Sequence, residues 1–148
     1  MKNQVTVSHE KNEQSEKIVE RYLECLKNQN YKEARTLLKH DFKHNLDRNK
    51  METGINNCDD AINHAREVGS FDYEMVDIFS CGNKVAGRYI CTVSSDHIPK
   101  AKPGEKVKVE GIMIAYIENG QIAEVWHQQD MLGLFIDLGM IPQPVNSF

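Results

Sequence analysis

The chain has 148 residues, of which 40% are hydrophobic and 27% are charged, and its net charge is −4. This length fits one domain that buries roughly two thirds of its unfolded surface, so a core can form without disulfide or metal staples. The acidic balance gives no electrostatic attraction to nucleic acid or to an anionic membrane surface, and we expect neither partner. No apolar run is long enough to span a bilayer, and the polar segment 1–16 lacks the features of a secretory signal.

The cysteines are isolated from one another in the sequence. Cys25, Cys58, Cys81 and Cys91 form no Cys-x-x-Cys pair. This spacing favours reduced thiols in a cytoplasmic protein over disulfides or a zinc site. The sequence also lacks a glycine-rich phosphate loop, a Gly-x-Ser-x-Gly elbow and a dinucleotide-binding fingerprint, so we expect no metal and no cofactor.

The amino-terminal part of the chain is predicted to be helical. Residues 1–12 are polar and predict a disordered lead-in to a single domain over 13–148. Ser15 is a favourable helix N-cap. The apolar residues that follow recur at the 3.6-residue period of an amphipathic helix, namely Ile18, Val19, Tyr22, Leu23 and Leu26. They predict a helix that ends near Gln29, and a second, short helix follows over 31–39.

Between the helices and the later strands the pattern is weaker. Segment 42–46 alternates between apolar and polar residues and predicts a short strand, followed by a polar loop over 47–57. Asn57 or Asp59 can cap a third helix that runs to about Val68.

The remaining chain reads as strands. They are predicted over 71–80, 85–94, 107–118 and 121–130. Asn119-Gly120 is the strongest hairpin signal, because a type I′ turn needs positive φ at both central residues. A short helix over 131–138, ended by Gly139 and Pro142, completes the pattern. Helices first and strands afterwards predict an α+β fold with the helices on one face of an antiparallel sheet.

The strand over 107–117 is apolar on both faces beyond Gly111. One face would cover the helices or a cavity. The other would pack against a second chain, because an exposed apolar sheet face marks an interface. We therefore expect a homodimer.

The segment that follows the predicted hairpin places the only tryptophan close to a histidine and an aspartate. Side chains alternate along a strand, so Trp126 and Asp130 share one face while His127 lies on the other. An ionised carboxylate is costly to bury without a partner, so either the strand ends at water near Asp130 or Asp130 faces a cavity. Asp130 is equally suited to cap the helix that begins at Met131. We expect His127 on the opposite face or at the dimer interface, unless a β-bulge resets the register.

The run from Gly120 to Gly139 resembles the end of the SnoaL-like polyketide cyclase and ester cyclase family, within the nuclear transport factor 2-like superfamily. That family ends in Gly-Lys-Ile-x-Glu-x-Trp-x-x-x-Asp followed by x-x-Gly-Leu-x-x-Gln-Leu-Gly. The matching residues are Gly120, Ile122, Glu124, Trp126, Asp130, Gly133, Leu134, Leu138 and Gly139, with Asp137 at the family's Gln. The resemblance implies a cone-shaped fold, in which amino-terminal helices pack on a curved antiparallel sheet and enclose a cavity, and it also implies a homodimer.

The resemblance also implies site residues. Asp130 matches the family's general base, which removes a proton next to a carbonyl, and His44 lies where members carry a polar histidine at the cavity mouth. Arg88, followed by an aromatic residue as in the family, would bind a polar ligand group or fix Asp130. Trp126, Tyr89 and Tyr116 are the expected apolar lining. From the residues alone, a helix cap for Asp130, a solvent-facing strand position for His44 and a surface position for Arg88 are equally open, and Trp126 also suits a core.

Two functions follow as expectations. One is a cofactor-independent cyclase, isomerase or dehydratase that acts on a hydrophobic, carbonyl-bearing small molecule, because such chemistry needs only a placed base and a polarised carbonyl. The other is a noncatalytic ligand-binding or dimerising domain on the same fold. Val93 favours the second, since it stands where the family carries a histidine.

Overall fold

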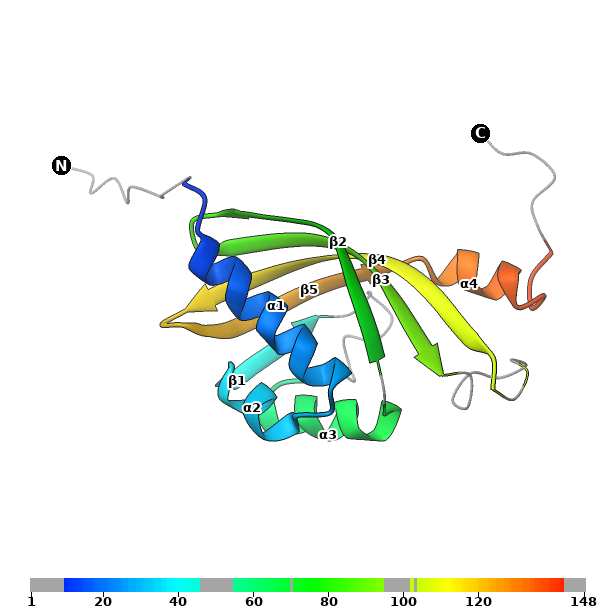
Figure 1. The fold of residues 1–148 in the computed structure, drawn as a ribbon, viewed down its shortest axis with the longest axis horizontal. Helices are drawn as coiled ribbons and strands as arrows, with labels where there is room; N and C mark the ends of the chain where they lie inside the picture. The colour runs from blue at the N-terminus through cyan, green and yellow to red at the C-terminus, as the bar shows by residue number, and fades with distance from the viewer. Residues whose placement is uncertain (1–9, 46–54, 70, 95–101, 103, 143–148) are drawn as a thin grey trace.

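Helices fill the concave side of a curved sheet in this protein (Figure 1). The computed structural model describes residues 10–45, 55–69, 71–94, 102 and 104–142. The elements in chain order are α1 (Glu13–Lys27), α2 (Tyr31–Thr36), β1 (Leu38–Asn45), α3 (Cys58–Val68), β2 (Phe71–Cys81), β3 (Lys84–Ser94), β4 (Lys106–Glu118), β5 (Gln121–Gln129) and α4 (Met131–Asp137). The arrangement is the predicted α+β class.

The five strands form one mixed sheet in the order β1-β5-β4-β3-β2. Strands β2 to β5 are antiparallel neighbours, as predicted, but β1 joins β5 in parallel. A tight hairpin forces its two strands to run antiparallel, whereas β1 and β5 are separated by most of the chain and have no such constraint. This parallel pair brings β1 beside β5 at the edge of the sheet.

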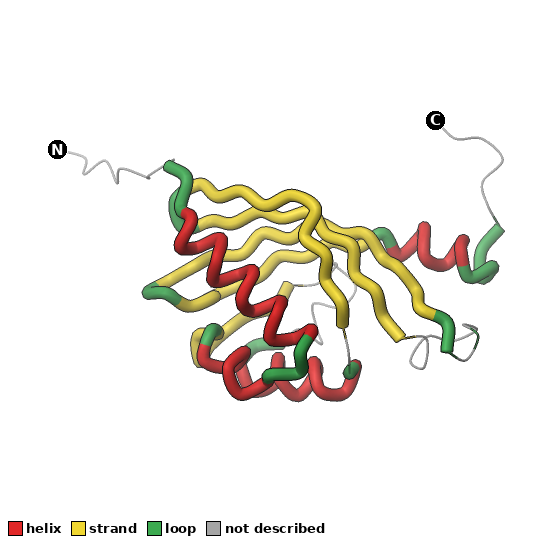
Figure 2. Tube along the Cα trace, in the orientation of Figure 1, coloured by secondary structure: helices red, strands yellow, loops and turns green. Residues whose placement is uncertain are grey.

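Helix α1 lies along the concave side of the sheet, mainly against β2 (Figures 1 and 2). Its buried face includes Val19, Leu23 and Leu26, which belong to the main hydrophobic core. The helix begins earlier than predicted, because Asn12 rather than Ser15 is the N-cap and its side chain accepts a bond from the Ser15 amide at 3.1 Å. The amphipathic period nevertheless identified the buried face correctly.

The residues just before α1 are held by the turn between β2 and β3. The backbone carbonyl of Glu10 accepts a bond from Gly82 at 2.9 Å, and the Asn12 amide donates to the Ser80 hydroxyl at 2.7 Å. Residues 1–9 of the predicted lead-in lie outside the described residues, whereas 10–12 are fixed to the sheet.

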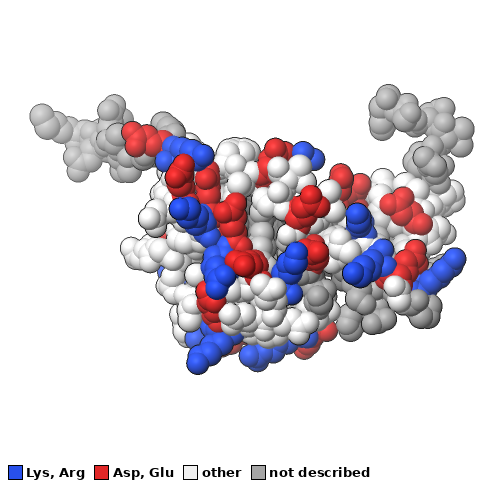
Figure 3. All heavy atoms as spheres, viewed as in Figure 1, with Lys and Arg blue, Asp and Glu red and all other residues white. Residues whose placement is uncertain are grey.

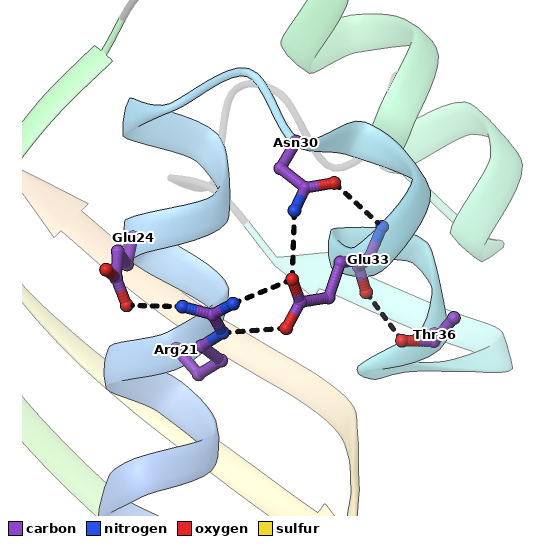
Figure 4. Close-up of polar contacts among 5 residues, drawn as sticks. All are labelled: Arg21, Glu24, Asn30, Glu33 and Thr36. Atoms are coloured by element: carbon purple, nitrogen blue, oxygen red, sulfur yellow. Dashed lines mark hydrogen bonds and ion pairs between the residues drawn. The ribbon is translucent and has the colours of Figure 1, made fainter.

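Arg21 joins α1 to α2 (Figure 4). Its guanidinium donates two bonds to the Glu33 carboxylate, at 2.7 and 2.8 Å, and a third to Glu24 at 2.8 Å. Asn30 caps α2 and also donates to Glu33 at 2.9 Å. Charges of both signs alternate over this face of the molecule (Figure 3), so the cluster sets the position of α2 in a screened environment and adds little stability.

The boundary between α2 and β1 also differs from the prediction. Helix α2 ends at Thr36 and β1 begins at Leu38, because Leu38 pairs with Ile122 and the Leu37 carbonyl accepts a bond from Ile122 at 2.8 Å. Pairing with β5 thus overrides the local helical pattern. Helix α3 is capped by Asn57, as predicted.

The two faces of the sheet differ sharply in exposure. Along β4 the odd-numbered residues from Val107 to Ile117 are buried toward the helices and the even-numbered ones face outward. The outward face carries large exposed apolar side chains, including Phe79 (63% exposed), Ile112 (57%) and Trp126 (44%). We call these the inner and outer faces of the sheet.

A β-bulge in β5 decides which of its side chains reach the inner face. The predicted turn is present, with positive φ at Asn119 (49°) and Gly120 (75°). From the turn, Glu118 pairs with Gln121 and Ile117 with Ile122, and the register then shifts, so that Ala123 is an extra residue in β5. Beyond the bulge, His127 lies opposite the buried Met113 and Trp126 lies on the outer face.

Candidate functional site

A small cavity lies between α1 and the inner face of the sheet. Its volume is about 60 Å³. The lining residues are Tyr22, Leu23, Leu26, Phe42, His44, Tyr73, Met113, Val125 and His127. None of them carries a permanent charge, so the two histidines supply the main polar character of an apolar chamber.

The two histidines are bonded to each other. Nε2 of His44 lies 3.3 Å from Nδ1 of His127, and the rings stack with centroids 5.4 Å apart and 19° between planes. Strand β1 supplies His44 and β5 supplies His127, so the parallel pairing of these two strands creates the contact. A hydrogen bond between two neutral imidazoles uses one proton, whichever ring donates it.

Burial keeps both imidazoles neutral. It lowers the pKa of His127 to about 4. For His44, burial and then the repulsion of charge on His127 and His64 lower the pKa to about 3. A charged imidazole loses its hydration in the apolar chamber, and no described carboxylate in the cavity lining replaces it.

Tyr89 packs behind the cavity wall. Its ring centroid lies 5.2 Å from that of Tyr73 and 5.0 Å from that of His127, and both of those rings line the cavity. Tyr89 is fully buried. Among the described side chains that lack solvent contact, its hydroxyl and Nε2 of His127 have no hydrogen-bond partner.

The structure therefore separates the residues that the sequence grouped together. His44 lines the cavity, as predicted, and Tyr89 adjoins it. The lining of this cavity does not include Trp126 and Tyr116, which were expected there, or Arg88, which was expected to bind a polar ligand group or to fix Asp130. The Trp126 side chain is exposed on the outer face, Arg88 is exposed there in an ion pair with Asp77 at 2.8 Å, and the Tyr116 ring lies under Lys84.

Asp130 caps α4 and does not line the interior cavity. Its carboxylate accepts a bond from the Gly133 amide at 2.8 Å, which is the role that a favourable N-cap residue plays. Asp130 and Arg88 border the same concavity of about 290 Å³ together with Ile112 and Gln128, but this concavity lies on the outer face. Arg88 and Asp130 thus border one concavity on the opposite side of the sheet from the cavity, and the ion pair of Arg88 is with Asp77.

His127 is the interior residue that the sequence placed incorrectly. The alternation was right, since His127 and Trp126 do lie on opposite faces. The error lay in which face is interior, because it depends on the bulge at Ala123. Ile122 and Val125, both buried and three residues apart, are the sequence signal of that bulge, since an unbroken strand buries residues at even spacing.

Other classes of site leave no sign in the described part of the chain. No group of three His, Cys, Asp or Glu side chains there could hold a metal ion. No disulfide joins the four cysteines. No described helix has the length and apolarity needed to cross a membrane.

Acid should destabilise the protein through these two histidines. They bind a proton near pH 6.5 when unfolded, but only near pH 3 to 4 when folded. Their contribution to stability is therefore present above pH 6.5 and is lost as the pH falls from 6.5 toward the pKa values of the folded state, about 3 and about 4. We expect the free energy of unfolding to fall by on the order of 2 kcal/mol for each histidine between pH 7 and pH 5.

Urea unfolding at the two pH values measures this loss. His127→Gln should remove a large part of it, whereas His40→Gln, at an exposed histidine of β1, should keep it in full. An unchanged pH dependence in His127→Gln would contradict the assignment.

Substitutions at Asp130 distinguish its role as a helix cap from a role that needs its charge. Asp130→Ala should lower the free energy of unfolding by about 1 kcal/mol, because the Gly133 amide loses its acceptor. Asp130→Asn should be nearly neutral, since asparagine caps helices about as well. Thermal unfolding of the two variants side by side checks the difference, and equal losses would mean that the charge of Asp130 matters to the fold.

Comparison with known proteins agrees with this architecture. No curated protein sequence matches the chain. IdmH from Streptomyces antibioticus, a candidate polyketide cyclase, superposes with a TM-score of 0.73 at 16% identity, over 85% of this chain and 99% of that one. A candidate ketosteroid isomerase from Kribbella flavida gives 0.66 at 14% identity, over 92% and 83%.

A nuclear transport factor 2-like protein from Cytophaga hutchinsonii gives a TM-score of 0.63 at 20% identity, over 91% of this chain and 99% of that one. At these identities the likeness establishes the fold, which is the nuclear transport factor 2-like cone. Residues 16–138 match the SnoaL-like polyketide cyclase family. The match covers most of the chain, and the protein belongs to that family.

Proposed function

We propose that the protein binds an uncharged, largely apolar small molecule with a carbonyl group in its interior cavity and moves a proton next to that carbonyl. The bonded pair of neutral histidines carries this proposal. One proton lies between the rings, so the two outer nitrogens, Nδ1 of His44 and Nε2 of His127, are always one donor and one acceptor. Proton transfer next to a carbonyl needs a donor for the oxygen and an acceptor for the proton.

The reaction class remains cyclisation, isomerisation or dehydration without a cofactor, since these share the proton-transfer step. The acid–base role that the family resemblance implied for Asp130 passes to the histidine pair in this proposal, because the Asp130 carboxylate is engaged as a cap outside the cavity. His44 keeps the catalytic role first assigned to it.

Exchange of the α-hydrogens of cyclohexanone in D₂O tests this function without knowledge of the natural ligand. We expect the protein to accelerate exchange at pH 7, as followed by proton NMR, and His44→Gln to lose at least tenfold of that acceleration. An effect of about a hundred- to ten-thousandfold is usual for one acid–base group, so tenfold is a lower limit.

Asp130→Asn is the informative comparison in this assay. We expect it to retain exchange, and loss in Asp130→Asn with retention in His44→Gln would return the role to Asp130. Binding of cyclohexanone without exchange would instead support a noncatalytic binding domain on this fold. Native mass spectrometry of the purified protein should also show any retained natural ligand.

A second function, assembly into a homodimer, is supported by the outer face of the sheet. Five large apolar side chains are exposed there, namely Val76, Phe79, Ile112, Ile114 and Trp126. Arg88 and Asp77 lie on the same face and carry opposite charges. In a dimer with a twofold axis, Arg88 of one copy would therefore face Asp77 of the other, and the reverse. Large exposed apolar patches mark interfaces, and we propose that this face packs on its own copy.

Native mass spectrometry at micromolar concentration tests the dimer. Ile112→Glu, at the centre of the face, should give monomers, because it buries a carboxylate against the partner. Leu132→Glu is the matched control, since Leu132 is equally exposed (56%) but lies on α4. A wild-type monomer, or equal dissociation in both variants, would exclude the outer face as the interface.

A further inference from the structure

Two buried polar atoms beside the cavity have no hydrogen-bond partner among the residues that the structure describes, although their rings pack together. They are the hydroxyl of Tyr89 and Nε2 of His127. The ring centroids lie 5.0 Å apart with planes tilted by 56°. Buried polar groups are almost always bonded to protein or to water, so two adjacent exceptions require a reason.

The Tyr89 hydroxyl occupies space that is free because Gly111 has no side chain. Gly111 lies opposite Tyr89 in the register of β3 and β4, and a Cβ at Gly111 would overlap the hydroxyl oxygen and the carbon that bears it. Strand β4 thus leaves out a side chain where the hydroxyl lies. A phenylalanine would pack in the same position without an unpaired polar atom, so packing alone does not account for the hydroxyl.

We infer that the Tyr89 hydroxyl and Nε2 of His127 together bind the carbonyl oxygen of the ligand. This deepens the proposed function and rests on it. A carbonyl oxygen has two lone pairs and accepts from two donors. His127 must then carry its proton on Nε2, so the shared bond is donated by Nε2 of His44 to Nδ1 of His127.

This tautomer gives each histidine one role. His127 joins Tyr89 as a donor to the oxygen, and Nδ1 of His44 is left as the acceptor of the proton. In the reaction, the bond between the α-carbon and its hydrogen breaks and the proton binds Nδ1 of His44. The electron pair left on carbon forms a carbon–carbon double bond, and the carbonyl π pair moves onto the oxygen, where two donors stabilise it.

The ligand is therefore a neutral ketone or aldehyde. A carboxylate would enter a chamber whose described lining offers no positive charge, and its desolvation would oppose binding. The carbonyl end enters first, toward the part of the wall that His127 forms and behind which Tyr89 packs.

Two probes of the same shape test the oxygen site. Cyclohexanone carries the carbonyl, and methylenecyclohexane has a CH₂ group in its place. We expect the wild-type protein to bind both and to prefer cyclohexanone. Tyr89→Phe should weaken the binding of cyclohexanone by about tenfold, which is the upper range for one neutral hydrogen bond. The affinity for methylenecyclohexane should stay unchanged. Tyr31→Phe makes the same change outside the cavity lining and should alter neither affinity.

Two spectra report on the geometry directly. The carbonyl stretch of bound cyclohexanone should shift to lower frequency in the wild type and return toward its free value in Tyr89→Phe. Long-range proton–nitrogen NMR correlations should show protons on Nε2 of both His44 and His127. A proton on Nδ1 of His127 would overturn the assignment of roles.

The outcomes separate this inference from the function on which it rests. If both probes bind and Tyr89→Phe affects them equally or not at all, the oxygen site is excluded while the cavity stands. If neither probe binds the wild type, the proposed function fails and this inference fails with it.

Discussion

The extra residue in β5 is the constraint on which the interior of this protein depends. A two-residue turn fixes how β4 and β5 pair, and an unbroken ladder from Ile117 and Ile122 would place Trp126 opposite Met113 on the inner face. Insertion of Ala123 moves the register by one, and a shift of one residue exchanges the two faces of a strand. His127 becomes the interior residue and Trp126 the exterior one. The polar chemistry of the cavity is therefore set by one backbone irregularity about four residues away.

The parallel pairing of β1 with β5 places a second histidine beside His127. With His127 turned inward, β1 is the neighbouring strand, and its pairing with β5 sets His44 beside it. One nitrogen of each ring is then hydrogen-bonded to the other ring inside an apolar chamber. This bond offsets part of the free-energy cost of burying two neutral imidazoles. The low pKa of His127 follows from this enclosure, and that of His44 follows first from enclosure and then from repulsion by charge on His127 and His64.

The sequence predicted the elements well and the site less well, for a physical reason. Helix α3 with its Asn57 cap, the Asn119-Gly120 turn and the Asp130 cap follow from local rules, and each is present. The start of β1 at Leu38 and the interior place of His127 depend on contacts with distant strands, and local patterns carry little trace of them. His44 was found from the resemblance, whereas its partner needed the register of the sheet.

In this chain, the residues that match the family motif differ from the polar residues at the cavity. The motif that identifies the family, from Gly120 to Gly139, fixes a turn, a helix cap and a packed terminal helix, and these are tasks of folding. Asp130 serves that purpose here, with its carboxylate on a backbone amide. The cavity carries different polar groups, drawn from β1, β3 and β5, and fold similarity alone does not determine what they do. Because the inner and outer faces of one sheet alternate residue by residue, the same strands present the paired histidine rings to the interior and an apolar surface to the outside. If the cavity binds a ligand and the outer face binds a second copy, a substitution on one face would therefore change one property without the other.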